Sequence, residues 1–407
     1  MTNFLYELYP FGKGEPFVEY EMKAFGNNRM EGLRVFYLKA LKDMEKRYIP
    51  SNAELVRMNY GQTFNARFLA FLKMFSLDSI KEVAYVIKTK QKEGLLRSLF
   101  RIYRYWTVAI GFMIQYKSLE LKEDEVFVSY WLNECAFALT ELKRKHPNIK
   151  IASRGHGYDV FEERCYMPFR RQILSGLDKI FLINEASREY FKKHYGEWLD
   201  TSKIEISHLG VDLPQKTSEA EDKIFRVVTC STVIPLKRID LMIDALSKIK
   251  DKKIEWVHIG DGPLMSDMQN YAKQKLAKTN IEYKFLGQLV LSDVHKYYES
   301  AKVNLFVNCS DTEGTPVSVM EAMSYGIPCV ARNVGGMAEV LTNDCGVLLG
   351  ADAGSVELSA AIEQMYSLDS KVYLEKRANA RKKIEDEFDA SKTFKDYILR
   401  VTRLGNK

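Results

Sequence analysis

The sequence predicts an α/β protein with two doubly wound halves, each a parallel sheet covered by helices. Short β-branched runs alternate with segments of helical periodicity along the chain, which is the pattern of βαβ units. A polar stretch at 213–223 without apolar periodicity interrupts this alternation and is interpreted as a linker. The length of 407 residues also suits two domains.

The first half starts with a short strand that is followed by the glycine-containing loop at 9–17. Four further runs of β-branched and aromatic residues predict strands, and helical periodicity follows two of them. The strands are expected at 126–130, 149–153, 179–183 and 204–208, and the helices at 132–145 and 185–195.

The second half repeats the pattern with strands expected at 225–230, 254–259, 282–286, 303–307, 328–331 and 346–349. We therefore expect a domain at 1–213, a second domain at 224–385, and a helix at 386–407 that returns to the first domain. Ligands of such sheets bind at the carboxyl ends of the strands. The expected site is the cleft between the two facing sheets.

Composition excludes several classes of protein. Hydrophobic residues make up 46% of the chain, which is too much for a wholly disordered protein. The net charge of +6 is too weak to indicate nucleic-acid binding. The six cysteines include no CxxC pair and no zinc-ligand spacing, so we expect free thiols in a reducing compartment. The N-terminus lacks a signal-peptide pattern and the longest apolar run, 108–114, is too short to span a membrane. We expect a cytoplasmic protein, free or peripheral at the inner face of the plasma membrane.

The most informative motif lies at 309–323, directly after the strand expected at 303–307. Glu313 falls in the strand-to-helix loop and Glu321 about a turn and a half into the following helix. We expect Thr315 to cap this helix and Pro316 to be its first residue. The backbone N–H groups from Gly314 to Val317, a span that includes Thr315 and Pro316, would then form a phosphate site without a metal.

Glu313, seven intervening residues and Glu321 resemble the paired glutamates of family 4, the retaining, nucleotide-sugar-dependent glycosyltransferases. The resemblance implies the GT-B fold, in which two Rossmann-like domains face each other across the active-site cleft. It also implies that Glu313 lies near the donor sugar and its β-phosphate, and that Glu321 holds the ribose hydroxyls. No cofactor is implied, because the nucleotide sugar is a substrate.

The turn at 231–238 resembles the family's Gly-Arg-Leu-x-x-x-Lys turn, whose Arg and Lys neutralise the donor diphosphate. Lys237 matches the lysine, and Arg238 stands next to it. Ser231 stands where the family has glycine and Thr232 where it has arginine, so the pattern is only partly kept. We assign Thr232, Lys237 and Arg238 to the donor diphosphate, and Lys237 also to catalysis, since a departing diphosphate needs compensating positive charge. The acidic cluster at 123–125 precedes a strand rather than following one, so no metal is expected.

In the first half, Gly155-His156-Gly157 follows a strand directly. A histidine between two glycines is expected to be exposed to the cleft, with a proton affinity suited to neutral pH. By resemblance His156 contacts the donor sugar or the reacting centre. The other five histidines, and Gly335 with Gly336, are interpreted as structural. Gly12 and Gly14 in the 9–17 loop are assigned to donor binding, because small residues let the backbone approach a ligand.

A basic, aromatic segment at 95–117 is a second candidate surface. Residues 51–117 carry 11 basic and 4 acidic side chains. Arg97, Arg101 and Arg104 fall on one face of the expected helix, which suits an anionic membrane surface or a lipid-diphosphate acceptor. The alternative, which we favour, is an ordinary amphipathic helix whose apolar face, including Ile102, lies in the core.

The combined prediction is a metal-independent, retaining glycosyltransferase that uses a UDP- or GDP-sugar. Its acceptor would be a glycan or a polyprenyl-linked sugar, as in family members that build bacterial capsule, O-antigen or exopolysaccharide. Two alternatives remain: a catalytically degenerate partner subunit, which Thr232 keeps open, and another GT-B enzyme such as a nucleotide-sugar epimerase. No nucleic-acid partner is expected.

Overall fold

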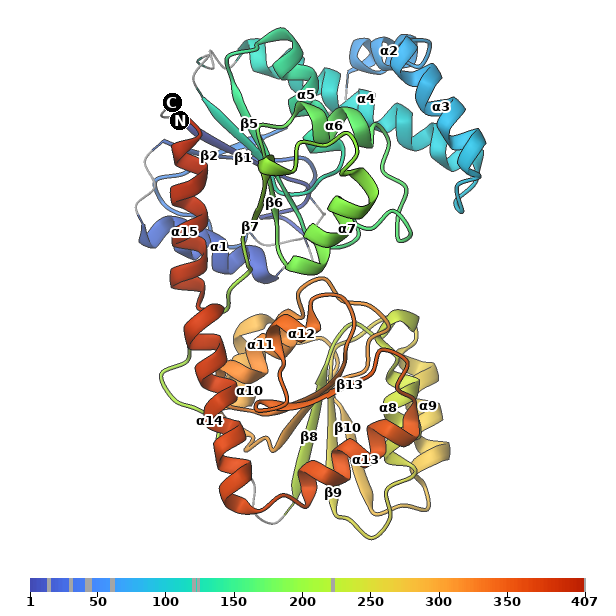
Figure 1. The fold of residues 1–407 in the computed structure, drawn as a ribbon, viewed down its shortest axis with the longest axis vertical. Coiled ribbons are helices and arrows are strands. Elements are labelled where there is room, and N and C mark those ends of the chain that lie inside the picture. The colour runs from blue at the N-terminus through green and yellow to red at the C-terminus, as the bar shows by residue number, and fades with distance from the viewer. Residues whose placement is uncertain are drawn as a thin grey trace. The chain divides into compact units, whose positions relative to one another are not determined.

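The computed structural model describes residues 1–12, 16–28, 32–40, 46–58, 63–118, 122, 125–220 and 224–405. They form two compact units (Figure 1). Unit 1 consists of Met1–His208 together with Phe394–Lys407, and unit 2 consists of Leu209–Thr393. Each unit contains one sheet in which every pairing is parallel, so the predicted α/β class is confirmed.

Unit 1 has a seven-stranded sheet in the order β3-β2-β1-β4-β5-β6-β7. All five residues of β1 are buried, as expected for a strand covered on both faces. The strands are β1 (Thr2–Tyr6), β2 (Leu33–Tyr37), β3 (Glu54–Arg57), β4 (Val126–Ser129), β5 (Lys150–Gly155), β6 (Lys179–Leu182) and β7 (Ile204–Ile206).

Helices cover both faces of the unit 1 sheet (Figure 1). Leu5 of β1 belongs to a core shared with α4, α5 and α6, whereas its neighbour Phe4 contacts Phe25 and Tyr397 on the other side. Phe25 lies on α1 and Tyr397 on α15, so the part of α15 that starts at Phe394 packs within unit 1. The helices are α1 (Pro16–Asn27), α2 (Phe64–Lys73), α3 (Leu77–Thr89), α4 (Leu95–Ser118), α5 (Glu134–Lys145), α6 (Arg170–Gly176), α7 (Glu185–Tyr195), the 3₁₀ turn η1 (Thr201–Lys203) and α15 (Ala390–Arg403).

Unit 2 has a six-stranded sheet in the order β10-β9-β8-β11-β12-β13. Helices α8, α9 and α13 share one core with the sheet, and α11 packs with α14. The strands are β8 (Phe225–Cys230), β9 (Ile254–Ile259), β10 (Ile281–Phe285), β11 (Leu305–Asn308), β12 (Cys329–Arg332) and β13 (Gly346–Leu349). The helices are the 3₁₀ turn η2 (Pro235–Lys237), α8 (Ile239–Leu246), α9 (Met265–Leu276), α10 (Leu291–Ser300), α11 (Val317–Ser324), α12 (Met337–Val340), α13 (Ser355–Tyr366) and α14 (Ser370–Glu387).

Both sheets share one topological feature that positions a ligand site. The first strand of each sheet lies beside the fourth, β1 beside β4 and β8 beside β11. The chain winds outward in opposite directions from this point, so the loops after the two strands diverge and leave a crevice at their carboxyl ends. In unit 2 these are the loops after Cys230 and after Asn308, which contain the predicted donor residues.

The segment predicted to be a linker is partly packed on unit 2 rather than extended in solvent. Ser218 is buried, and its N–H donates to the Tyr325 carbonyl at 2.9 Å. The guanidinium of Arg377 donates to the Ser218 carbonyl. Residues 221–223 of the predicted linker lie outside the described residues. Among the helices of the described ranges, none is both long and apolar enough to cross a bilayer.

Helix α4 contains the three arginines that were expected on one basic face. Ile102, Tyr105 and Trp106 lie in the core, as the favoured alternative expected. Arg101 pairs with Glu93 at 2.8 Å, and Arg104 pairs with Glu7 at 2.7 Å and with Glu134. Two of the three arginines are thus neutralised by neighbours, and Arg97 alone of the three is exposed.

Candidate active site

Lys237 and Glu313 meet at the crevice of unit 2. Lys237 ends the short turn η2 in the loop after β8, and Glu313 lies in the loop after β11. The Lys237 ammonium is 2.7 Å from Glu313 Oε1. The Asn308 side-chain amide at the end of β11 donates to the same oxygen at 3.1 Å. Glu313 is buried at 8% exposure. Two donors hold its carboxylate in place, one in the loop after β8 and one at the end of β11.

The loop that contains Glu313 is packed closely against a glycine turn. Gly335 has φ +58, and a Cβ at this position would lie 1.9 Å from the Glu313 carbonyl oxygen. The Gly336 N–H donates to the Gly314 carbonyl at 2.9 Å. Gly335 therefore has a structural role, because no side chain fits between its backbone and that of Glu313. The Gly336 hydrogen bond ties the same turn to the loop.

The start of α11 differs from the prediction. The helix begins at Val317, and Pro316 is its N-cap residue with ψ +79, which is not helical. The Val317 N–H donates to the Thr315 carbonyl at 2.9 Å in a tight turn around Pro316. Proline has no N–H, and that of Val317 is already used. Neither Pro316 nor Val317 therefore supplies an amide donor to a phosphate in this conformation.

Glu321 lies on α11, on the side that faces the end of β8. It is buried at 5% exposure. Burial raises the pKa of Cys230, the last residue of β8, to about 12, and the negative charge of Glu321 contributes to the increase. The second predicted glutamate thus lies close to the strand end from which the Lys237 loop departs.

Arg238 points away from Glu313. It has φ +50 and pairs with Asp240 at 3.0 Å and with Asp311 at 3.2 Å. These three residues line a hollow of about 470 Å³ whose other walls come from residues 233–236, Ile239, Leu264 and Met268. Lys237 and Glu313 do not line it. Thr232 is exposed in the same loop.

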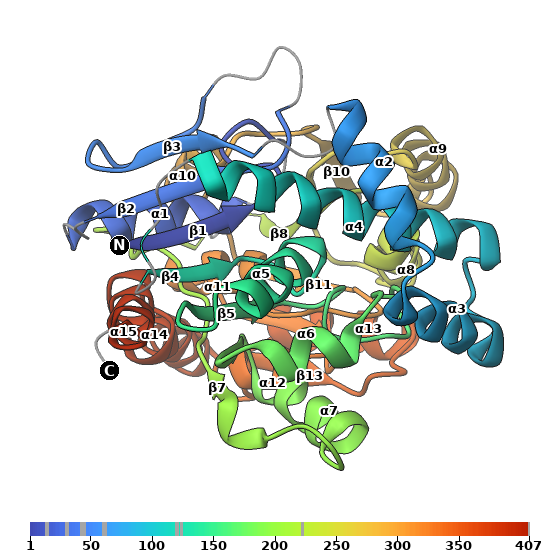
Figure 2. The same cartoon turned by 90° about the horizontal axis from the view of Figure 1, so that it is seen from above.

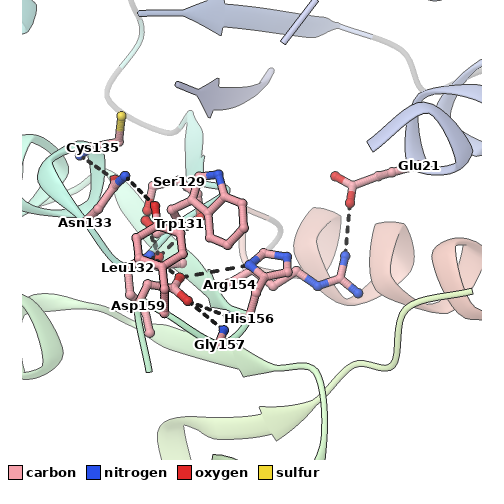
Figure 3. A network of polar contacts seen from close by, with 12 residues as sticks. Glu21, Ser129, Trp131, Leu132, Asn133, Cys135, Arg154, His156, Gly157 and Asp159 are labelled. Carbon is pink, nitrogen blue, oxygen red and sulfur yellow. Dashed lines mark hydrogen bonds and ion pairs between the residues drawn. The ribbon is translucent and has the colours of Figure 1, made fainter. Parts of the chain in front are cut away.

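His156 is buried, which corrects the prediction that it is exposed (Figure 3). It follows β5 as predicted, but its ring centroid lies 4.4 Å from those of Tyr130 and Trp131 and 6.1 Å from that of Phe17. Burial lowers the pKa of His156 below its ordinary value, although Asp159 opposes the shift. His156 is therefore neutral at pH 7 and can act as a hydrogen-bonding group rather than as a cation.

Asp159 holds the loop that contains His156, and the sequence interpretation did not select it. Its Oδ1 accepts from the N–H groups of His156 and Gly157, both at 2.9 Å, and its Oδ2 accepts from the Leu132 N–H at 2.9 Å. Burial raises the pKa of Asp159, but interactions with His156 and the backbone N–H groups outweigh it and lower the pKa. The imidazole Nδ1 lies 3.9 Å from Oδ2, which is too far for a hydrogen bond.

Arg154 and Glu21 form a fully buried ion pair beneath this loop (Figure 3). Arg154 Nη1 is 3.0 Å from Glu21 Oε2, and Nη2 donates to the Ser207 carbonyl at 2.9 Å. The guanidinium also lies over the Tyr397 ring of α15, 4.4 Å from its centroid. One side chain of β5 thus joins α1, the end of β7 and the C-terminal helix.

The predicted residues fall into two groups. The structure brings Lys237, Glu313 and the 314–317 loop together in unit 2, with Glu321 behind them, whereas Gly12 and His156 belong to unit 1. Gly12 is buried, and a Cβ there would lie 2.5 Å from that of Leu8. Gly14 lies outside the described residues, as do Glu123 and Asp124 of the acidic cluster. Within the described ranges, no three His, Cys, Asp or Glu side chains are grouped as a metal site would require.

The sheet of unit 2 matches a known protein family. Residues 225–367, which contain every strand of the unit 2 sheet, match the family described as "Glycosyl transferases group 1". Unit 2 therefore belongs to the group 1 glycosyltransferases, which confirms the family resemblance of the sequence.

Two relatives match the chain over somewhat more than half of its length. The amylovoran biosynthesis glycosyltransferase AmsK of Erwinia amylovora is 22% identical over 262 residues, 61% of this chain and 63% of that protein. One component of the phosphatidylinositol N-acetylglucosaminyltransferase of Arabidopsis thaliana is 25% identical over 240 residues, 58% of this chain and 52% of that component. The matched region thus spans between half and two thirds of the length of these relatives.

Two solved structures share the architecture over almost the full length. The lipopolysaccharide outer core galactosyltransferase WaaB in its apo form gives a TM-score of 0.71 at 15% identity, covering 99% of both chains. Anabaena Alr3699/HepE in complex with UDP and glucose gives a TM-score of 0.66 at 16% identity, again over 99% of both chains. The chain therefore has the GT-B fold.

Proposed function

We propose that this protein is a retaining glycosyltransferase that transfers a sugar from a UDP- or GDP-sugar to a hydroxyl of a glycan or polyprenyl-linked acceptor. The family match of unit 2 supports the class of reaction. The relative AmsK acts in amylovoran biosynthesis, which supports a role in the synthesis of a surface polysaccharide. The HepE structure contains UDP and glucose, which supports a UDP-sugar donor.

The observation that carries the proposal is the 2.7 Å contact between Lys237 and Glu313 at the crevice of unit 2. An ammonium has three donor hydrogens, so Lys237 can keep Glu313 in place and still donate to a phosphate oxygen. The same positive charge offsets the charge that develops on a departing diphosphate. In this arrangement Glu313 orients the donor sugar, and Thr232 and the 314–317 loop border the diphosphate. Arg238, which points away from Glu313 and pairs with Asp240 and Asp311, is left out of the proposed site.

In the proposed reaction, the bond from the sugar C1 to the diphosphate oxygen breaks and a bond to the acceptor oxygen forms on the same face. The acceptor proton passes to the leaving diphosphate. No metal takes part, since Lys237 supplies the compensating charge. Neutral His156 donates or accepts a hydrogen bond at the donor sugar. Gly12 is proposed to bind the donor as well, and the same role is proposed for Gly14, which lies outside the described residues.

A panel of nucleotide sugars tests the proposal directly. Purified protein is incubated with UDP-, GDP- and ADP-sugars in the presence of a chelator, and nucleotide release is measured with and without a polyprenyl-linked acceptor. We expect release from one class of donor, increased by the acceptor and unchanged by the chelator. Binding without turnover in every case would favour a catalytically degenerate protein, and conversion to an epimeric nucleotide sugar would favour the epimerase.

The role of Glu321 in holding the ribose has its own test. Glu321→Ala is expected to weaken donor binding about tenfold or more, because a carboxylate that accepts from ribose hydroxyls contributes charge-assisted hydrogen bonds. Glu375→Ala, an exposed glutamate of α14 in the same unit, is the matched control. Calorimetric titration with the preferred nucleotide measures both variants. Equal affinity of the two would refute the ribose role.

The six cysteines are all free thiols in the structure, and this supports a cytoplasmic location for the proposed reaction. A polyprenyl-linked acceptor would bring the enzyme to the inner face of the plasma membrane.

A further inference from the structure

Helix α2 places its small residues inward and its large aromatic residues outward. Ala66 and Ala70 are buried, whereas Phe64, Phe68 and Phe71 are exposed. Phe75, in the turn that follows, extends the same spacing of four, three and four residues, which places all four rings on one side. The exposed fraction of Phe64 reaches 80%. An amphipathic helix of a water-soluble surface has the opposite arrangement.

The exposed rings are ordered against one another rather than folded back onto the core. The Phe64 and Phe68 rings stack at a centroid distance of 6.2 Å, and those of Phe71 and Phe75 meet edge to face at 5.4 Å. Aromatic pairs of this kind are normally found inside proteins and interfaces. Exposed apolar side chains that gather in this way mark a contact site.

Helix α3 continues the apolar surface. Leu77, Ile80, Ala84 and Ile87 recur at helical spacing and are all exposed, with Leu77 at 75%. The buried residues Ser79 and Val86 lie on the opposite side of the helix. The helix therefore packs on unit 1 through a narrow strip and leaves its main apolar stripe uncovered.

The first turns of α4 complete the surface with Leu96, which is 83% exposed, and Phe100. Helices α2 and α3 both pack on α4. In both views the three segments lie together at one margin of unit 1 (Figures 1 and 2). We call the exposed apolar residues of 64–100 the outer patch: Phe64, Phe68, Leu69, Phe71, Leu72, Phe75, Leu77, Ile80, Tyr85, Ile87, Leu95, Leu96 and Phe100.

Basic side chains accompany the outer patch. Residues 64–100 contain 7 basic and 3 acidic side chains. The three acidic residues are engaged with groups outside this surface or at its edge: Asp78 with Arg144, Glu82 with Tyr166 and Glu93 with Arg101. Among the described residues, no acidic group pairs with the exposed lysines 81, 88, 90 and 92 or with Arg97. The surface therefore presents apolar rings together with uncompensated positive charge.

We propose that the outer patch docks unit 1 on an anionic lipid bilayer, with the aromatic and aliphatic side chains entering the interface and the lysines contacting lipid phosphates. Amphipathic helices bind membranes through this combination. A second copy of the chain fits less well, because a two-fold contact would face one positive patch with another. The inference does not depend on the sugar-transfer reaction.

Sedimentation with vesicles tests the proposal. The full chain is mixed with phosphatidylcholine vesicles that contain about one third phosphatidylglycerol, and with vesicles of phosphatidylcholine alone. We expect binding to the anionic vesicles that weakens at least about tenfold when salt is raised from about 0.05 M to about 0.5 M. Absence of binding to anionic vesicles at low salt would overturn the proposal.

Two variants separate the apolar from the charged contribution. The triple variant Phe64→Ser, Phe68→Ser, Phe75→Ser is expected to lower vesicle binding by about tenfold or more, because each ring loses its transfer into lipid. The double variant Lys81→Glu, Lys88→Glu is expected to lower binding to anionic vesicles by about tenfold. Its two side chains are exposed, so folding is not at risk.

The matched control is the double variant Val356→Ser, Leu374→Ser, which removes two equally exposed apolar side chains from unit 2. It should bind vesicles as the unaltered protein does. Equal binding by the control and the triple variant would overturn the role of the outer patch. Light scattering of the free protein provides a second readout: a dimer that the triple variant dissociates would instead assign the patch to a second copy of the chain.

Discussion

Lys237 and Glu313 are separated by 76 residues, yet the ammonium and carboxylate are 2.7 Å apart. The contact exists because β8 and β11 are neighbours at the point where the sheet of unit 2 reverses its winding. Burying a carboxylate lowers the stability of the fold unless a cation and further hydrogen-bond donors contact it. Here Lys237 and Asn308 both donate to it, so charge balance and site geometry depend on the same pair.

The first prediction concerns this pair. Lys237→Ala is expected to lower kcat/KM by about 10²–10³, because the charge that offsets the departing diphosphate is lost. Glu313→Gln should also lower it. The double variant should lose less than the product of the two effects, since residues in direct contact are energetically coupled. Steady-state nucleotide release is measured for the two single variants and the double variant. The control is Lys296→Ala, which changes an exposed lysine of α10. Additive losses would contradict a functional pair.

The second prediction separates a steric clash from backbone strain at Gly335. Gly335 and Gly287 both have positive φ, at +58 and +72, but only Gly335 would place a Cβ against another backbone. Gly287→Ala should cost about 1–2 kcal/mol for the left-handed conformation alone. Gly335→Ala should cost clearly more and should also lower donor turnover, because the Glu313 loop must move. Thermal unfolding measures the loss of stability, and nucleotide release measures the loss of turnover. Equal losses in the Gly335→Ala and Gly287→Ala variants would refute the clash.

The third prediction concerns the buried pair of Arg154 and Glu21. Burial already raises the pKa of Glu21, and Arg154 opposes that shift. Arg154→Met should destabilise unit 1 by about 3–5 kcal/mol, because it leaves a buried carboxyl group without its cation. Adding Glu21→Leu should restore much of the loss. Urea unfolding provides the measurement, and Lys192→Ala, which breaks an exposed pair with Glu189 in the same unit, should cost at most about 1 kcal/mol.

The fourth prediction is an acid sensitivity of unit 2 that originates at His258. Its side chain is fully buried, and burial lowers its pKa to about 4 from the ordinary 6.5. Between these two values the unfolded chain binds more protons than the native one, so stability falls as the pH falls through this window. The loss attributable to this residue amounts to about 3 kcal/mol.

Replacing the group that titrates checks this assignment. His258→Gln cannot be protonated in this range, so its urea unfolding free energy should change less between about pH 7 and about pH 4 than that of the unaltered protein. The two proteins are compared by the slope of the unfolding free energy against pH. A loss of stability that is the same at every pH, such as loss of the 2.9 Å contact with Thr229, does not change this slope. Identical slopes would assign the acid sensitivity to other groups.

Local sequence patterns predicted the strands of unit 2 closely. All six of them begin within two residues of their predicted positions, because buried parallel strands are short apolar runs bounded by turns. The start of α11 was predicted slightly too early. Proline at the first helical position is common, but here the chain closes a tight turn around Pro316 before the helix begins at Val317.

The environment of His156 could not be read from its neighbours in the sequence. Flanking glycines favour exposure, but His156 is covered by the rings of Phe17 on α1 and of Tyr130 and Trp131 directly after β4. Asp159, three residues away, was within reach of sequence reasoning. An aspartate after a Gly-His-Gly turn is a natural acceptor for the backbone N–H groups of that turn.

The sequence by itself determined the alternation of strands and helices, the two-part organisation and the paired glutamates, since these depend on local periodicity and on spacing along one segment. The tertiary structure decided which distant groups meet. Strand order brought Lys237 to Glu313, ring packing buried His156, and the docking of α2 through its alanines left four phenylalanine side chains outside. Such contacts join residues that are far apart in the sequence. Local periodicity does not determine them, because it does not show which face of a helix packs against another element.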